Sequence, residues 1–228
     1  MRLQLAIGNK NYSSWSMRPW LILRHAGIDF EELMLRFDSF EVDSQFKQAA
    51  GKLSPTGKVP VLLVDGFPIW DTLAIAEFIA EQFPDRGLWP SDTFARARAR
   101  TLCAEMHAGF GALRDAFPMN IEASLPDVGA RLLAERPAVQ RDLDRLVAMW
   151  SAQLETSCGP GLFGDVGIVD LYYAPVVNRL RCYAPPVPPV IRAYMDHVWA
   201  LPAVQDWVRD ALAEHDFLPF EEPYRQAR

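Results

Sequence analysis

Strand-type patterns occur only in the first third of this chain, where they alternate with helical patterns. Residues 2–7 place Leu3, Leu5 and Ile7 on one face, as a half-buried strand does. The Asp65-Gly66 pair favours a two-residue hairpin turn. The order of apolar runs predicts strands at 2–7, 30–37, 61–64 and 67–70, with helices at 18–26, 43–50 and 71–82. A right-handed crossover would make the first two strands parallel. This β-α-β-α-β-β-α order predicts a small α/β domain over residues 1–82.

Residues 83–91 are rich in proline and turn-forming residues, and after them the strand patterns stop. We therefore expect a linker at 83–91 and an all-α domain over residues 92–228. Helices are predicted at 92–117, as one long element, and at 125–136, 137–155, 170–181, 188–200 and 203–214. Prolines stand near the starts of four of these helices, where a first-turn proline is tolerated: Pro126, Pro137, Pro189 and Pro202.

The charge balance argues against a nucleic-acid partner. The chain has 23 Lys and Arg against 29 Asp and Glu, a formal net charge of −6, and no basic run. No apolar run is long enough for a membrane span, and the start does not resemble a signal peptide, so we expect a cytoplasmic protein with no membrane partner. The 3 cysteines and 4 histidines lack ligand spacing, so neither a metal site nor a disulfide framework is expected.

A serine-rich loop separates the first predicted strand from the first predicted helix. Pro19 fits the first turn of a helix, which predicts a cap near Ser16 and leaves Ser13 and Ser14 in the loop before it. The start of a helix favours an anion such as a thiolate, and a nearby hydroxyl can donate a hydrogen bond to sulfur. The alternative is that these serines only cap the helix.

Two further stretches could bind a peptide-like ligand. The proline of Val59-Pro60 precedes a strand and can be cis, which exposes the backbone before it for pairing with a ligand, while Lys58 could meet a carboxylate. Asp71 and Thr72 start a helix and could bind the ammonium and carboxylate of an amino-acid head group. The alternatives are an ordinary loop at the first stretch and a simple helix cap at Asp71.

Together these features resemble the glutathione transferase superfamily, over nearly the whole chain. The resemblance implies a thioredoxin-like N-terminal domain, an all-α C-terminal domain and glutathione as co-substrate, without a metal. It implies that Ser13 or Ser14 faces the glutathione thiol. The implied glutathione-binding residues are Lys58, Val59, Pro60, Asp71 and Thr72.

The segment Ser13-Ser14-Trp15-Ser16-Met17-Arg18 is similar to the Ser-Ser-Cys-Ser-x-Arg signature of the zeta class, the maleylacetoacetate isomerase-like members, with Trp15 in place of Cys. The resemblance implies addition of the glutathione thiolate to small electrophiles, as in detoxification. The alternatives are a glutathione-dependent cis–trans isomerase and a binding module without activity.

Three further expectations come from the same resemblance. The first C-terminal helix faces the cleft in this family, so Trp15, Met106, Phe110 and Arg114 are expected in the second-substrate pocket; the alternative is that they only pack. The segment 161–171 resembles the family's buried capping motif, in which Asp170 would accept backbone N–H groups and support the fold. Members usually form homodimers, here through residues 67–81 and 92–117.

Overall fold

The N-terminal domain is a four-stranded sheet with helices on both faces. The computed structural model describes residues 1–228. Its strands are β1 (Leu3–Ile7), β2 (Glu31–Met34), β3 (Val61–Val64) and β4 (Phe67–Ile69), in the spatial order β2-β1-β3-β4. Strand β1 pairs in parallel with β2 and antiparallel with β3, and β3 pairs antiparallel with β4. The predicted β-α-β-α-β-β-α order is confirmed, although β2 is shorter than the predicted strand at 30–37.

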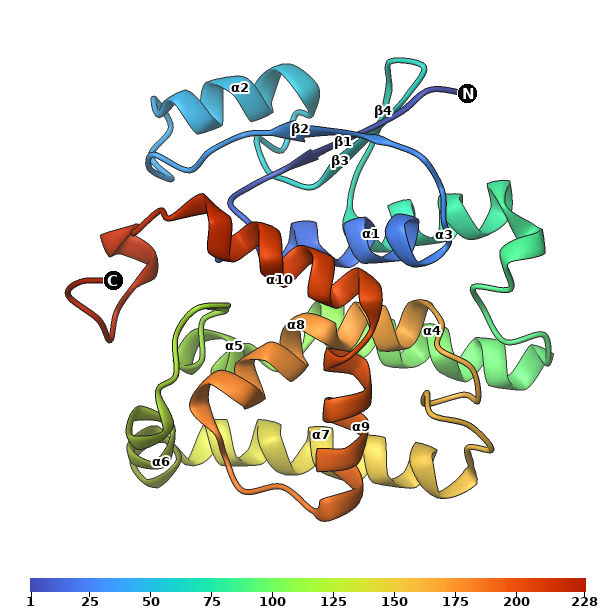
Figure 1. Cartoon of the computed structure of the whole chain (residues 1–228), viewed down its shortest axis with the longest axis vertical. Coiled ribbons are helices and arrows are strands. Elements are labelled where there is room, and N and C mark those ends of the chain that lie inside the picture. Colours follow the sequence, from blue (N-terminus) through green and yellow to red (C-terminus); the bar gives the residue numbers. More distant parts are fainter.

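The helices divide between the two faces of this sheet. Helix α2 (Gln45–Leu53) covers one face, and α1 (Ser14–His25) and α3 (Thr72–Gln82) cover the other, next to the helical domain (Figure 1). Leu5 and Leu62 lie opposite each other in the sheet and are fully buried. Burial of such a side chain stabilises the fold by about 1.5–3 kcal/mol. The sheet thus fixes the position of the loop that joins β1 to α1.

The second part of the chain is entirely helical, as predicted. All four singled-out prolines lie in the first turn of a helix. The elements are η1 (Pro84–Arg86), α4 (Thr93–Ala108), α5 (Gly111–Ala116), α6 (Pro126–Glu135), α7 (Pro137–Thr156), α8 (Ile168–Tyr183), α9 (Pro189–Trp199), α10 (Pro202–Glu214) and η2 (Pro219–Glu221). No helix is both long enough and apolar enough to cross a membrane.

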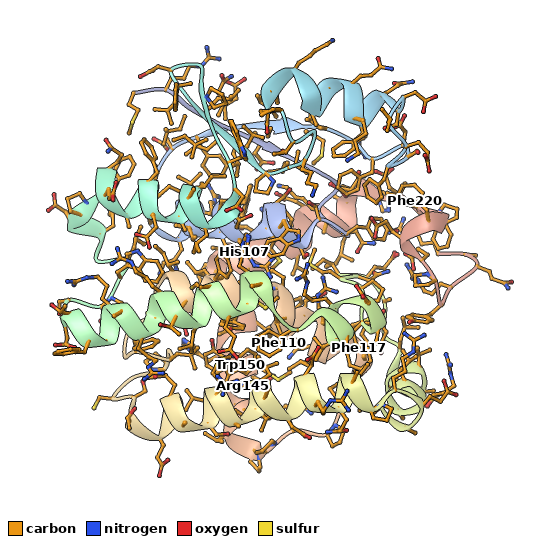
Figure 2. All side chains as sticks on the ribbon, turned by 180° about the vertical axis from the view of Figure 1, so that it is seen from behind. His107, Phe110, Phe117, Arg145, Trp150 and Phe220 are labelled. Atoms are coloured by element: carbon orange, nitrogen blue, oxygen red, sulfur yellow. The ribbon has the colours of Figure 1, made fainter.

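The prediction of one long helix over 92–117 is wrong, because the chain breaks at Gly109 and Phe110. Phe110 has φ of 57°, in the left-handed region, and α5 starts directly after it. A Cβ atom at Gly109 would lie 2.7 Å from the carbonyl oxygen of Glu105, so only glycine fits this turn. Figure 2 shows Phe110 and Phe117 on the side of α4 and α5 that faces Trp150 of α7. The break therefore lets both phenylalanines enter the core.

The start of the first helix was also predicted wrongly. Helix α1 begins at Ser14 rather than near Arg18, with Ser13 as its N-terminal cap residue, and Pro19 lies inside it. Proline inside a helix removes one backbone hydrogen bond. Helix α1 packs against β1, α3, α8 and α10, and these contacts stabilise the helix despite the missing bond.

Helix α8 forms the centre of the helical domain. All of its residues except Arg181 are buried. The carboxylate of Asp170 accepts hydrogen bonds from the backbone N–H of Leu162 (2.9 Å), the backbone N–H of Gly167 (3.0 Å) and the hydroxyl of Tyr194 (3.0 Å). Burial raises the pKa of Asp170, and these three hydrogen bonds oppose that rise. Gly167 supplies no side chain to the cap, so the carboxylate alone joins the turn to the helix.

The C-terminal part of the chain contacts the loop that joins β1 to α1. Helix α10 runs along α1 between the domains (Figure 1). The buried Lys10 ammonium lies 2.7 Å from Asp210 and 2.9 Å from Glu32, and the indole of Trp207 donates to the Lys10 carbonyl (3.0 Å). The residues after α10 therefore lie beside the serine-rich loop.

Candidate active site

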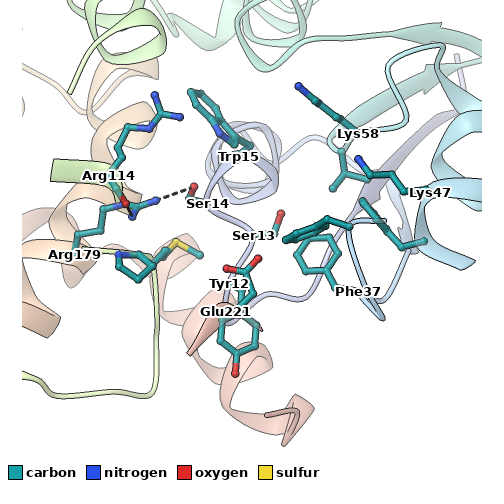
Figure 3. A pocket seen from close by; sticks show the side chains of 15 residues that line it. Tyr12, Ser13, Ser14, Trp15, Phe37, Lys47, Lys58, Arg114, Arg179 and Glu221 are labelled. Atoms are coloured by element: carbon teal, nitrogen blue, oxygen red, sulfur yellow. Dashed lines mark hydrogen bonds between the residues drawn. The ribbon is translucent and has the colours of Figure 1, made fainter. Parts of the chain in front are cut away.

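A cavity of about 390 Å³ lies where the two domains meet the C-terminal segment. The serine-rich loop and Trp15 line it on one side, as Figure 3 shows. The helical domain contributes Arg114 and Arg179, and the C-terminal segment contributes Glu221. Its remaining apolar wall is formed by Phe37, Phe40, Phe46, Val59, Pro118 and Met119, and two lysines complete the lining, Lys47 and Lys58.

A second cavity, of about 450 Å³, adjoins the first and shares Trp15, Lys58, Val59 and Arg114 with it. It is also lined by Pro60, Asp71, Thr72 and His107. All five residues predicted to bind glutathione from the sequence therefore line one cavity. The Val59–Pro60 peptide bond is cis, as the sequence suggested.

The Ser13 hydroxyl is part of a short hydrogen-bond chain. It donates to the hydroxyl of Ser16 (2.7 Å), which in turn accepts the backbone N–H of Gly8 (3.1 Å). Ser13 is the N-terminal cap residue of α1, but its side chain makes no capping hydrogen bond to the helix backbone. Since a hydroxyl can rotate, the Ser13–Ser16 bond can reverse and leave the Ser13 hydrogen free to point into the cavity.

Ser14 lies in the first turn of α1 rather than in the loop before it, and its oxygen accepts a hydrogen bond from Nη2 of Arg179 (3.2 Å). Because the oxygen accepts from a cation, the hydrogen of Ser14 remains available to an anion in the cavity. Arg179 also donates to the carbonyls of Arg114 and Phe117, while its Nε is buried without a partner. Burial, together with the positive charges of Arg18 and Arg114, lowers the pKa of Arg179 to about 9.

Trp15 stands where the zeta signature has cysteine, and it lies between two guanidinium groups. The Arg18 guanidinium is 4.2 Å from the ring centroid and the Arg114 guanidinium is 5.0 Å away. Arg18 is buried and donates to the carbonyls of Ser14 and Tyr172 (2.8 Å each), and burial lowers its pKa to about 10. Arg18, Arg114 and Arg179 form no ion pair with a carboxylate. Arg114 and Arg179 line the cavity, so they make this wall positive.

Asp71 caps a helix, which is one of the two roles that the sequence left open. One carboxylate oxygen caps α3 by accepting the backbone N–H of Leu73 (3.1 Å), and the other lies 3.2 Å from Nε2 of His107. The side chain is 55% exposed, so it remains accessible from the second cavity. His107 also lies 3.0 Å from the hydroxyl of Tyr172, and this second contact fixes its ring.

The structure brings together only part of the expected second-substrate pocket. Trp15 and Arg114 line both cavities, but Met106 and Phe110 are 1% and 6% exposed and belong to the hydrophobic core. Met106 lies on the buried face of α4, and the break after α4 turns Phe110 into the core as well.

Arg179 and Glu221 are among the cavity residues that the sequence did not predict. Arg179 had a signal, because it is a cation in the mainly apolar segment 171–180, where an unpaired charge is costly. Glu221 had none, because it lies in an irregular segment of mixed composition near the end of the chain.

Comparison with known proteins agrees with this geometry. Residues 12–82 match the family described as glutathione S-transferase, N-terminal domain. A probable maleylacetoacetate isomerase of Caenorhabditis elegans is 29% identical, over 78% of this chain and 80% of that protein. Glutathione S-transferase Z1 of Arabidopsis thaliana is 26% identical, over 86% of this chain and 90% of that protein.

A solved structure is also similar to this chain, both in fold and in sequence. The glutathione transferase homolog from Burkholderia gl BGR1, with bound glutathione, superposes with a TM-score of 0.71 at 27% identity, covering 93% of this chain and 100% of that chain. The matched domain contains the serine-rich loop, the cis proline and the Asp71-Thr72 helix start. This chain is therefore similar to glutathione transferases in sequence and in fold over most of its length, and residues 12–82 match the N-terminal domain of that family.

Proposed function

We propose that this enzyme binds glutathione across the two cavities and adds its thiolate to a small electrophile. The observation that carries the proposal is the joint position of three features. The Ser13 and Ser14 hydroxyls line one cavity, while Asp71 and Thr72 line the other. The cis Val59–Pro60 peptide lies where the two meet. This order matches the thiol, the cysteinyl backbone and the γ-glutamyl end of glutathione, which the Burkholderia relative binds.

We expect the serine hydroxyls and the arginines to stabilise the thiolate form of glutathione. A free thiol near pKa 8.5 is only a few per cent ionised at neutral pH. Lowering that pKa by about two units requires about 2.7 kcal/mol. The hydroxyl of Ser13, the Arg179-bound hydroxyl of Ser14 and the start of α1 all favour the anion, and such contributions reach this size together.

The direct test combines binding and turnover. Calorimetric titration with glutathione should show one site per chain, and a panel of electrophiles should show glutathione-dependent loss of at least one of them. Absence of glutathione binding at millimolar concentration would contradict the proposal. Binding without turnover of any electrophile would favour a binding module instead.

Asp71→Ala is expected to weaken glutathione binding by about 1.5–3 kcal/mol, the range for a lost charged hydrogen bond. Asp71 also caps α3, so the unliganded protein should lose about 1 kcal/mol of stability. Calorimetry with and without glutathione separates the two effects. Asp92→Ala is a matched control, because Asp92 caps α4 in the same way and does not line the glutathione cavity. Equal loss of affinity in both variants would contradict a role in binding.

A second candidate activity is glutathione-dependent cis–trans isomerisation. Its support is the zeta-like serine segment together with relatives that bear the name maleylacetoacetate isomerase. An isomerase returns glutathione unchanged, whereas a transferase consumes it. Measuring thiol concentration during turnover therefore distinguishes the two.

We also propose a cytoplasmic homodimer. Phe67 of β4 and Phe94 of α4 are 70% and 85% exposed, and both lie on the surfaces expected to meet. Arg100 of α4 forms an ion pair with Glu77 of α3 in the same chain (2.7 Å). These two charges are therefore not available for an ion pair between the two subunits. Light scattering at micromolar concentration should give about twice the 25.7 kDa of the chain. Phe94→Glu should yield monomers, and a wild-type protein that is already monomeric would contradict the proposal.

A further inference from the structure

The C-terminal segment that follows α10 is anchored firmly to the serine-rich loop. Glu222 is 5% exposed, and its carboxylate accepts from the hydroxyl of Tyr12 (2.8 Å) and the amide of Asn120 (2.8 Å). Arg225 donates to both oxygens of the same carboxylate (2.8 and 2.5 Å). Tyr12 directly precedes Ser13, so these bonds hold η2 at a fixed position beside the thiol site.

Glu221, the neighbour of Glu222, is held differently. Its backbone N–H donates to the Leu218 carbonyl (2.8 Å), which fixes the turn, but its carboxyl group makes no hydrogen bond or ion pair. It lines the same cavity as Ser13 and Ser14, and Figure 3 shows the group directed toward the space between those hydroxyls. A half-buried carboxyl without a partner is costly when ionised, which favours its neutral form.

The surroundings of Glu221 decide how readily it holds a proton. Burial raises the pKa of Glu221 to about 7; the positive charge of Arg179 opposes the rise, and the negative charge of Glu222 adds to it. A carboxyl group with a pKa near the working pH is suited to proton transfer. The groups that face the cavity from the packed elements are Arg179 of α8, Arg114 of α5, Lys47 of α2, Lys58 before β3, and Tyr12 and the two serines of the β1–α1 segment.

We propose that Glu221 is a catalytic acid for electrophiles whose carbon–carbon double bond is conjugated to a carbonyl group, and that it protonates the enolate formed when the thiolate adds. The proposal rests on the proposed transferase function and assigns one residue and one substrate class to it. Glutathione releases its thiol proton to solvent. The thiolate sulfur forms a bond to the β-carbon, and the π electrons move onto the carbonyl oxygen.

Glu221 then donates its proton to that enolate, which gives the saturated adduct. The resulting carboxylate regains a proton from solvent, so the proton that glutathione lost is balanced. Displacement of halide from a halonitroarene needs no such proton, because the leaving halide carries the charge away. The two reaction types therefore differ in their need for Glu221.

Glu221→Gln tests this assignment, because glutamine has the shape of the neutral acid but no proton to transfer. Each protein is assayed with glutathione plus an α,β-unsaturated ketone, and with glutathione plus a halonitroarene, at about pH 6 and pH 8. At the lower pH the variant should lose at least ten-fold more kcat/KM on the ketone than on the halonitroarene. The excess loss should shrink at the higher pH, where the wild-type carboxyl is already ionised.

Two further measurements exclude a purely structural role. Asn120→Ala removes one hydrogen bond of the Glu222 anchor but keeps both carboxyl groups, so any loss it causes should be the same for both electrophiles. The folded protein holds the Glu221 proton more tightly than the unfolded chain, so stability should fall as pH rises from about 4.5 to about 7. Thermal unfolding of Glu221→Gln should show a weaker fall over that range.

Each outcome has a definite meaning. Equal losses of the Glu221→Gln variant on both electrophiles, or no loss on either, would overturn the assignment while leaving the transferase function intact. Absence of wild-type activity on both electrophiles would instead count against the proposed function.

Discussion

Replacing Asp170 with alanine is expected to lower the free energy of unfolding by about 4 kcal/mol. The side chain is fully buried, and its carboxylate is the acceptor for Leu162 N–H, Gly167 N–H and the Tyr194 hydroxyl. Its loss leaves three buried donors without a partner, and each unsatisfied group costs about 1–3 kcal/mol. For a chain of this length the melting temperature should drop by roughly 8–16 °C.

Thermal and denaturant unfolding of the variant measure this effect. Asp115→Ala is the matched control, since Asp115 is exposed on a helix and makes no side-chain hydrogen bond, and it should change stability by less than about 0.5 kcal/mol. Asp170→Asn keeps an acceptor oxygen and should lose less than the alanine variant. A loss below about 1 kcal/mol for Asp170→Ala would show that water satisfies the three donors.

Replacing Ser13 with alanine is expected to lower kcat by ten-fold or more while glutathione affinity changes little. The Ser13 hydroxyl lines the cavity of about 390 Å³ and is joined by hydrogen bonds to Ser16 and, through it, to Gly8. We expect its hydrogen bond to the glutathione sulfur to be strongest once the thiolate has formed. Ten-fold in rate corresponds to about 1.4 kcal/mol, within the range of one hydrogen bond to a charged group.

Steady-state rates together with direct titration of the bound thiol check this prediction. Ser14→Ala should be tested in parallel, because Arg179 polarises that hydroxyl in the same cavity. Ser91→Ala, in an exposed loop outside the thiol cavity, should keep full activity. If both Ser13→Ala and Ser14→Ala retained wild-type rates, a serine-based mechanism would be ruled out.

Local signals predicted the elements of the fold well. Asp65-Gly66 specified its hairpin, because both residues adopt positive φ (49° and 88°) as such a turn requires. The four first-turn prolines marked helix starts correctly. Pro19 led to a wrong start for α1, because contacts with other elements stabilise this helix although the proline lies inside it. The break at Phe110 was missed, since a left-handed phenylalanine has no signature of its own.

Some residues of the candidate site could likewise be predicted from local motifs, whereas others are positioned only by tertiary packing. Ser13, Val59, Pro60 and Asp71 stand in short motifs near turns, and the sequence pointed to each of them. The position of Arg179 depends on how α8 packs beneath α1, over a separation of 165 residues from Ser14. Met106 and Phe110 were expected in the pocket because the resemblance places the first C-terminal helix beside the cleft, and that expectation does not tell which of its side chains face the core.

The contacts between the first loop and the last segment limit how this chain can recombine. Lys10 pairs with Asp210, and Tyr12 pairs with Glu222, although both partners are encoded about 200 positions later. A chimera joined at the linker between the domains would inherit one half of each pair from a different parent. Exchange of the N-terminal domain alone would therefore separate the serine-rich loop from the C-terminal residues that pack against it. We expect substitutions at these four positions to arise together as such genes diverge, so that the two ends of the gene evolve as one unit.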